Sequence, residues 1–309
     1  PTEGIERLSV VYSMPEWILK LWKKTYDLDV IESMLQAFQE ETPVTIRCNL
    51  AKTTPENLKE SLQKEGVTVT PHPYLSYAFW IQDYDHLSEL ESFQKGEFYV
   101  QDISSMLVGE LADPKKRDRV IDVCAAPGGK ALHVAEKLRG TGSVEARDLS
   151  LYKVGLITEN IERSGLTNIH AVQKDATVCD ADVKDAADLV IADLPCSGLG
   201  VFGKKPDLKY RVKEEDLKEL AGLQRKILEN AQAMVKKGGT LLYSTCTIDP
   251  MENEENVHWF LKKYPQFSLD SIREKLCPQL AESVEEEGCI QLLPGIHCSD
   301  GFFIARLKK

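Results

Sequence analysis

The chain has 309 residues, of which 42% are hydrophobic and 28% are charged, and its formal net charge is −11. This composition excludes a disordered chain and predicts a globular protein with one large domain or two domains of ordinary size. No segment approaches the ~20 apolar residues that a membrane-spanning helix needs, and no leader peptide opens the chain, so we expect a cytoplasmic protein without a membrane partner.

Residues 1–96 are predicted to form a small α+β module. Apolar residues at helical spacing predict helices over Glu16–Lys24 and Val30–Glu40. A third helix is predicted from Thr54 to Lys64, because a proline follows Thr54 at a position suited to the first turn. Strands are predicted over Val44–Asn49, Val67–Thr70 and Ala78–Gln82. We place the boundary of this module near Gly96.

Residues 97–309 alternate between strands and helices, which predicts a doubly wound parallel sheet. The predicted strands are Val120–Cys124, Gly142–Arg147, Ile169–Gln173, Asp188–Ala192, Thr240–Ser244, Gln291–Leu293 and Phe302–Leu307. The predicted helices are Ala131–Leu138, Leu151–Ser164, Glu214–Val235 and Met251–Lys263. Gly238 and Gly239 are predicted to close the third of these helices.

Several polar side chains follow the predicted strands. In a doubly wound sheet the ligand binds beyond the carboxyl ends of the strands, so side chains at these ends are expected to converge. The residues in question are Cys124, Asp148, Asp175, Asp193 and Cys246.

The segment DVCAAPGGK, residues 122–130, leads from a predicted strand through a glycine turn into a helix. It is neither a Walker loop nor a dinucleotide fingerprint, because the required glycine spacing is missing. Asp148 suits a ribose diol, and Asp175 suits an adenine amino group. An acidic residue placed to bind a ribose, without a phosphate-binding loop, favours S-adenosylmethionine as the cofactor. The alternative is that the glycines form only a tight turn and the acids only cap helices.

Two cysteines at predicted strand ends, Cys196 and Cys246, suit nucleophilic chemistry, because helix N-termini and nearby cations lower the pKa of such thiols. A thiolate that adds to C6 of a pyrimidine makes C5 reactive toward a methyl sulfonium, and loss of the C5 proton then expels the thiolate. Asp193, three positions before Cys196, suits the N3 and N4 edge of the base.

The other cysteines offer no comparable pattern. None of the eight forms a C-x-x-C pair or lies near histidines at zinc spacing, so we expect reduced thiols and no metal. Five are predicted to be buried and chemically inert: Cys48, Cys179, Cys277, Cys289 and Cys298.

Charge is distributed unevenly along the chain. The acidic total argues mildly against a nucleic-acid partner, but basic residues form three clusters. These clusters are Lys20–Lys24, Lys115–Arg119 and Lys204–Arg211. We expect the first two to be solvated surface.

Three long motifs together resemble those of the Nop/Sun family of RNA cytosine-5 methyltransferases. They are DVCAAPGGK, Asp193–Arg211 and Tyr243–Val257. Tyr12–Trp22, Tyr99–Met106 and the ending DGFFIARLKK are similar to the bacterial Sun/Rsm-B branch, which methylates small-subunit ribosomal RNA. The resemblance covers essentially the whole chain.

The resemblance implies a Rossmann-like, S-adenosylmethionine-dependent methyltransferase domain over residues 97–309, behind an RNA-binding α+β module over residues 1–96. It implies Cys246 as the covalent nucleophile and Cys196 as the thiol that assists release, with Asp193 and Lys130 beside them. DNA cytosine-5 methyltransferases use the Pro-Cys thiol for the attack instead. The implied cofactor contacts are Cys124, Ala125, Ala126, Pro127, Gly128, Gly129, Lys130, Asp148, Asp175 and Asp193.

The resemblance also bears on the RNA contacts and on the extent of the chain. Lys204–Arg211 is expected to contact RNA. Full-length bacterial members carry a helical domain in front, so we expect this chain to be a shortened form. Nothing in the sequence suggests an obligate oligomer, so we expect a monomer. Ala131 stands where a threonine is common, which does not affect the chemistry.

Three other functions compete with ribosomal RNA methylation. A tRNA cytosine-5 methyltransferase shares the same motifs. A DNA cytosine-5 methyltransferase is disfavoured because no target-recognition insert is visible. A non-catalytic RNA-binding assembly factor is disfavoured because Cys196, Cys246 and Asp193 are all present.

Overall fold

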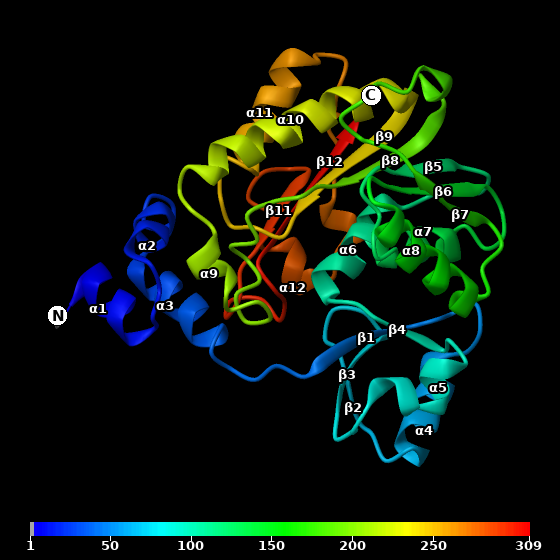
Figure 1. Ribbon diagram of the computed structural model, residues 1–309, viewed down its shortest axis with the longest axis horizontal. Coiled ribbons are helices and arrows are strands. Elements are labelled where there is room, and N and C mark those ends of the chain that lie inside the picture. Colours follow the sequence, from blue (N-terminus) through cyan, green and yellow to red (C-terminus); the bar gives the residue numbers. More distant parts are fainter. Residues whose placement is uncertain (1–2) are drawn as a thin grey trace.

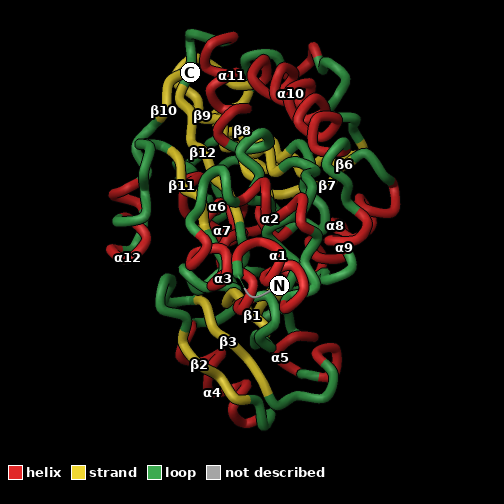
Figure 2. The backbone as a smooth tube through the Cα atoms, turned by 90° about the vertical axis from the view of Figure 1, so that its left-hand side faces the viewer, coloured by secondary structure: helices red, strands yellow, loops and turns green. Residues whose placement is uncertain are grey.

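The computed structural model describes residues 3–309. Figures 1 and 2 show a large α/β body, a smaller sheet with its own helices at one end, and the N-terminal helices at one side. No helix in the described part of the chain is both long and apolar enough to cross a membrane.

The first three helices pack on the large body. They are α1 (Gly4–Val11), α2 (Glu16–Trp22) and α3 (Leu28–Ala37). Their apolar faces form one core with Leu199, Phe202 and Leu217, and the Trp22 ring lies 6.2 Å from that of Phe202. These helices therefore support the loop that follows Cys196.

The small sheet has the strand order β2-β3-β1-β4, and all its pairs are antiparallel. Its elements are β1 (Val44–Cys48), α4 (Pro55–Lys64), β2 (Thr68–Pro71), β3 (Ala78–Gln82), η1 (Leu87–Glu89), α5 (Glu91–Gln94) and β4 (Phe98–Val100). The α4 helix begins as predicted, because the Thr54 side chain accepts a hydrogen bond from the Asn57 amide and Pro55 occupies the first turn. Gly96 lies before β4, which still pairs with β1.

The large sheet has the order β10-β12-β9-β8-β5-β6-β7, and β11 pairs with β12. Its strands are β5 (Arg119–Asp122), β6 (Ser143–Asp148), β7 (Ile169–Gln173), β8 (Ala187–Asp193), β9 (Val235–Thr245), β10 (Ser268–Leu269), β11 (Cys289–Leu292) and β12 (Phe302–Lys308). The five strands β5 to β9 are parallel, which confirms the predicted doubly wound arrangement, whereas β10, β11 and β12 pair in antiparallel fashion.

Helices cover both faces of the large sheet (Figure 1). The helical elements of this domain are α6 (Ile103–Ala112), α7 (Gly129–Lys137), α8 (Leu151–Ser164), η2 (Ala181–Val183), α9 (Leu208–Arg211), α10 (Asp216–Met234), α11 (Glu254–Lys263), η3 (Arg273–Lys275) and α12 (Pro278–Ala281). Leu107, Leu132 and Ile157 bring α6, α7 and α8 into the core of one face. Ile227 and Phe260 bring α10 and α11 into the core of the other. This is the three-layer arrangement of a Rossmann-like domain.

Two predictions are wrong in detail. Gly238 and Gly239 do not close a helix, because α10 ends at Met234 and β9 begins at once. Instead they lie in an irregular stretch of β9, where the register with β8 shifts and Gly238 has a φ of +74°. Cys179 and Cys298 are exposed, not buried, because both lie in loops.

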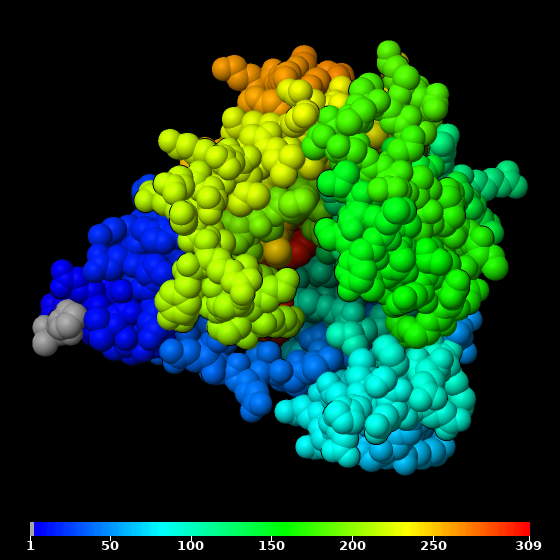
Figure 3. Space-filling view, in the orientation of Figure 1, coloured from blue at the N-terminus to red at the C-terminus, as the bar shows by residue number. Residues whose placement is uncertain are grey.

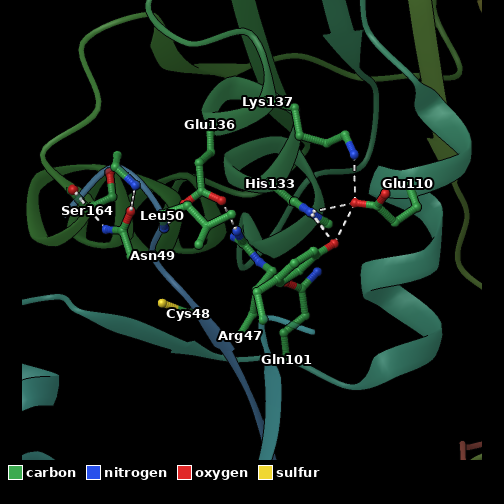
Figure 4. Close-up of polar contacts among 12 residues, drawn as sticks. Arg47, Cys48, Asn49, Leu50, Gln101, Glu110, His133, Glu136, Lys137 and Ser164 are labelled. Carbon is green, nitrogen blue, oxygen red and sulfur yellow. Dashed lines mark hydrogen bonds and ion pairs between the residues drawn. The ribbon is translucent and has the colours of Figure 1, made fainter. Parts of the chain in front are cut away.

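Buried polar contacts join the small sheet to α7 (Figure 4). Arg47 of β1 donates to Gln101 Oε1 at 2.7 Å and to Glu136 Oε1 at 2.9 Å. Asn49 donates to the carbonyl oxygens of Gly96 and Ser164. The two sheets are therefore held in one arrangement by specific hydrogen bonds as well as by apolar packing.

Candidate active site

The polar side chains predicted at strand ends lie at one edge of the large sheet. Asp148 and Asp193 are the last residues of β6 and β8, and Cys246 follows β9 directly. Cys124 and Asp175 lie two residues beyond β5 and β7. Figure 3 shows a hollow on this face, between the yellow-green segment of α9 and α10 and the green segment of α8.

A cavity of about 330 Å³ brings four of these residues together: Cys124, Asp148, Asp175 and Asp193. Leu149, Leu194 and Ile227 add apolar walls. Asp148 Oδ2 accepts a hydrogen bond from the Ala126 amide at 3.3 Å. The cavity therefore combines carboxylate acceptors with apolar side chains.

Asp175 is exposed to the cavity as an anion. Its Oδ1 accepts hydrogen bonds from the hydroxyl and the amide of Thr177, at 2.7 and 2.8 Å, and these bonds hold the pKa of Asp175 below its usual value. The carboxylate can therefore accept a further hydrogen bond from a ligand at neutral pH.

The glycine turn borders this cavity. Among the residues 124–130, Cys124 and Ala126 line it, whereas Ala125, Pro127, Gly128, Gly129 and Lys130 do not. Gly128 has a φ of +107°, a conformation that a residue with a side chain rarely adopts. The turn therefore needs glycine at this position to lead from β5 into α7.

Lys130 points from α7 toward the end of β8. Its Nζ lies 2.7 Å from Asp193 Oδ2 and donates to Ser105 Oγ at 3.0 Å. Ser244 Oγ donates to the other oxygen of Asp193 at 2.8 Å. Burial alone would lower the pKa of Lys130, but the carboxylates of Asp193 and Asp122 outweigh it and raise that pKa. Lys130 is therefore a fixed cation and not a base.

Cys196 and Cys246 face each other with their sulfur atoms 3.2 Å apart. The hydrogen bond with Cys196 lowers the pKa of Cys246, while burial and the Asp193 carboxylate oppose this effect and the cations Lys130 and Lys205 add to it. The same hydrogen bond, together with burial, raises the pKa of Cys196. Of the two thiols, Cys246 has its pKa lowered and Cys196 has its pKa raised, so the geometry suits a Cys246 thiolate that accepts a hydrogen bond from Cys196.

A buried carboxylate, Glu252, holds both cysteine loops in place. It accepts hydrogen bonds from the Ser197 amide at 3.0 Å and from Gln224 Nε2 at 2.7 Å, and Gln224 also donates to the Pro195 carbonyl. Ser197 Oγ lies 2.7 Å from Thr247 Oγ1, next to Cys246. The separation of the sulfurs therefore depends on a network that lies behind them.

Three further site residues, Ser105, Ser244 and Glu252, were not predicted from the sequence. The only signal for Glu252 is its place in the polar run MENEENV after the second cysteine motif, and Ser105 belongs to the phrase YVQDISSM. The position of these residues in the two segments does not predict that their side chains reach the site, because tertiary contacts bring them there.

The predicted RNA-contacting segment Lys204–Arg211 is less free than expected. Lys204 Nζ lies 2.7 Å from both Asp102 Oδ2 and Asp300 Oδ2. Arg211 pairs with Asp207 at the surface. Lys204 and Lys205 are both exposed, but Lys204 is held by two carboxylates and is therefore part of the framework.

Comparisons with known proteins give consistent matches. Residues 110–308 match the family model described as 16S rRNA methyltransferase RsmB/F, and residues 14–84 match a ferredoxin-like domain model of RsmF/B-like methyltransferases. The chain is 39% identical over 308 residues to the probable ribosomal RNA small subunit methyltransferase B of Bacillus subtilis, covering 99% of this chain and 69% of that protein. It is 33% identical to the ribosomal RNA small subunit methyltransferase F of Cronobacter sakazakii, covering 96% of this chain and 63% of that protein.

Solved structures agree with the sequence matches. The crystal structure of PH0851 superimposes with a TM-score of 0.92 and 31% identity, covering 100% of this chain and 69% of that one. The crystal structure of NSun6 from Pyrococcus horikoshii with SFG gives a TM-score of 0.81 and 26% identity, covering 100% of this chain and 98% of that one.

Proposed function

The chain belongs to the 16S rRNA methyltransferase RsmB/F family, and we propose that it transfers a methyl group from S-adenosylmethionine to C5 of a cytosine in small-subunit ribosomal RNA. The chain spans about two thirds of the length of the curated relatives it matches, so this activity is proposed from the part present. The observation that carries the proposal is the pair of sulfur atoms 3.2 Å apart beside the Lys130–Asp193 ion pair.

The cavity at the strand ends fits the proposed cofactor. Asp148 would hold the ribose hydroxyls and Asp175 the adenine amino group, with Leu149 and Ile227 against the ring. The carboxylates suit a nucleoside and disfavour a pyrophosphate. The related NSun6 structure with SFG, an S-adenosylmethionine analogue, supports the same assignment. When bound, the cofactor supplies a methyl group on a sulfonium, which is electrophilic.

The attack is assigned to Cys246. Its thiolate forms a bond from Sγ to C6 of the cytosine, and the electron pair of the C5–C6 double bond moves into the ring and makes C5 nucleophilic. The Lys130 ammonium supplies positive charge near the developing negative charge, and Asp193 accepts a hydrogen bond from the base.

Release is assigned to Cys196. Its pKa is raised first by its hydrogen bond to Cys246 and then by burial, and the first of these causes disappears once Cys246 carries carbon. Cys196 then loses its proton to solvent and, as a thiolate, takes the proton from the methylated C5. The electrons of the C5–H bond re-form the C5–C6 double bond, the C6–Sγ bond breaks, and Cys246 leaves as a thiolate. The starting protonation of both sulfurs is restored.

The N-terminal part is proposed to position the RNA. Residues 1–96 are the proposed RNA-binding module and residues 97–309 the proposed catalytic domain, and β4 of the latter range completes the small sheet. Arg47 contacts Glu136 of α7, which follows the glycine turn, and Asn49 contacts Ser164 at the end of α8, so the small module lies beside both helices.

The test is methyl transfer from labelled cofactor to naked small-subunit ribosomal RNA, followed by mapping of the modified nucleotide. We expect 5-methylcytosine at one position and no transfer to large-subunit ribosomal RNA in a parallel reaction. Label at a ring nitrogen, at a ribose or on a base other than cytosine would contradict the proposal.

A further inference from the structure

A second cavity, of about 410 Å³, lies where the N-terminal part meets the catalytic domain. It is lined by the segment 37–45, by Trp80, by Lys204 and by the loop 294–300, and we call it the linker pocket. We infer that the linker pocket binds an unpaired guanine of the substrate RNA next to the target cytosine. This inference rests on the proposed function and adds a specificity site to it.

The linker pocket is held in shape without a ligand. The loop 294–300 is tied to the small module, because the Cys298 amide donates to Tyr74 Oη at 3.0 Å and His72 Nε2 lies 3.1 Å from the Cys298 carbonyl. At Gly295 this loop packs so closely on α3 that a Cβ atom would lie 2.4 Å from the Ser33 carbonyl oxygen. A largely preformed, partly apolar cavity of this volume is typical of a binding site for a small ligand group.

The linker pocket adjoins the cysteine loops through the backbone. The Gly200 amide donates to the Cys246 carbonyl at 3.1 Å, and the Gly301 amide donates to the Gly200 carbonyl at 2.8 Å. Asp300, which lines the linker pocket, precedes Gly301. The linker pocket therefore borders the loops that carry the two cysteines, and we assign it to a nucleotide next to the target cytosine.

The walls suit a base and not a phosphate. Phe38 and Trp80 are half-buried aromatic side chains that line the cavity, and bases splayed from RNA stack on such rings. Three carboxylates, those of Glu40, Asp102 and Asp300, outnumber the one ammonium, and Lys204 is already bound to two of them. The excess negative charge repels a phosphate group.

The polar groups favour guanine among the four bases. A carboxylate only accepts hydrogen bonds, so it selects a base edge rich in N–H donors. Guanine carries two adjacent donors, N1–H and the N2 amine, on its Watson–Crick edge. Lys204 donates to Oδ2 of Asp300, so Oδ1 is the oxygen that we assign to accept one of these N–H groups.

Photo-crosslinking locates the base without requiring catalysis. Small-subunit ribosomal RNA transcribed with 6-thioguanosine is bound to the full chain and irradiated, and the linked peptides are identified by mass spectrometry. We expect links to residues 37–45, 78–82 or 294–300, and weaker links there from transcripts that contain 4-thiouridine. Links confined to other surfaces would overturn the inference.

Kinetics test the same site. Trp80→Ala is expected to raise the KM for RNA on the order of tenfold with little change in kcat, since stacking on one aromatic ring is worth about this much. Trp259→Ala is the matched control, because Trp259 is also half-buried but packs beside Arg225 and Lys263 on α10 and α11. An unchanged KM in Trp80→Ala, with normal methylation by the wild type, would overturn the inference.

A second variant covers the case in which Trp80→Ala does not fold. RNA with inosine in place of guanosine lacks the N2 amine. For each enzyme, the ratio of the KM for inosine RNA to the KM for guanosine RNA is measured. We expect this ratio to be larger for the wild type than for Asp300→Asn. An equal ratio for both enzymes would contradict guanine recognition. Absence of methylation by the wild type on every RNA would instead contradict the proposed function, and the crosslinks would still decide the linker pocket.

Discussion

Arg47 and Glu136 form a buried ion pair, 2.9 Å long, between the small sheet and α7 (Figure 4). The Arg47 side chain is 0% exposed and that of Glu136 is 5% exposed. The second oxygen of Glu136 accepts a hydrogen bond from the Leu50 amide at 3.0 Å. The Arg47 guanidinium lies 4.3 Å from the centre of the Tyr99 ring. This pair connects the proposed RNA-binding module to the helix that follows the glycine turn.

Arg47→Met is expected to lower the free energy of unfolding by about 3–5 kcal/mol, because it leaves the Glu136 carboxylate buried without its cation. Urea unfolding, followed by circular dichroism, measures this loss. Double replacement with Glu136→Gln should recover part of it, since the uncompensated charge is then removed. Lys95→Met is the control: Lys95 pairs with Glu91 in full solvent, so its loss should leave the unfolding midpoint unchanged.

Replacement of Cys246 and replacement of Cys196 are expected to block the reaction at different steps. Cys246→Ala should abolish both methyl transfer and the covalent enzyme–RNA species, because no sulfur is left to bond to C6. Cys196→Ala should let that species accumulate, because attack proceeds while release stalls. Denaturing gel electrophoresis with labelled RNA distinguishes the two. The reverse pattern would assign the attack to Cys196, as in DNA cytosine-5 methyltransferases.

The ionisation of Cys246 predicts a pH dependence for its alkylation. Only the thiolate reacts, so the rate rises with pH through the pKa of Cys246, which lies below the usual cysteine value. Cys196→Ala removes the hydrogen bond that lowers this pKa most, so the curve should move to higher pH. Cys196→Ser keeps a donor and should move it less. Iodoacetamide labelling quantified by mass spectrometry gives the curves, with the exposed Cys179 as a reference in each sample.

The lowered pKa of Cys246 has a second cause, the nearby cation Lys130, which can be removed separately. Lys130→Met takes away a cation near Cys246, so the alkylation curve should again move to higher pH. A curve that stays in place in both Lys130→Met and Cys196→Ala would show that these groups do not set the pKa of Cys246.

Asp148 is expected to determine cofactor affinity. Asp148→Asn removes the charge from the proposed ribose acceptor, and a hydrogen bond to a charged group contributes enough for a loss on the order of ten- to a hundredfold in Kd. Isothermal titration calorimetry with S-adenosylmethionine measures it. Glu159→Gln, an exposed change on α8, is the control. Equal affinity in Asp148→Asn would place the ribose elsewhere.

Much of the catalytic domain could be predicted from the chain order of its elements. The strands β5 to β8 lie within a few residues of the predicted ranges, because apolar runs between glycine turns and helices specify buried parallel strands. The short strand β4 and the helix α6 have no such pattern. The α6 helix is apolar nearly all round, since it is buried by its neighbours, so helical periodicity is weak there.

The sequence by itself determined which residues reach the edge of the sheet, because a side chain at the carboxyl end of a parallel strand always lies at that edge. Asp148, Asp193 and Cys246 were identified on this basis. Only the three-dimensional structure shows that two thiols, 50 residues apart in the chain, lie 3.2 Å apart in surroundings that lower the pKa of one and raise that of the other. The reason is physical: the pKa of Cys246 depends on a hydrogen bond and on two lysines that only folding brings near, and no spacing along the chain encodes those distances.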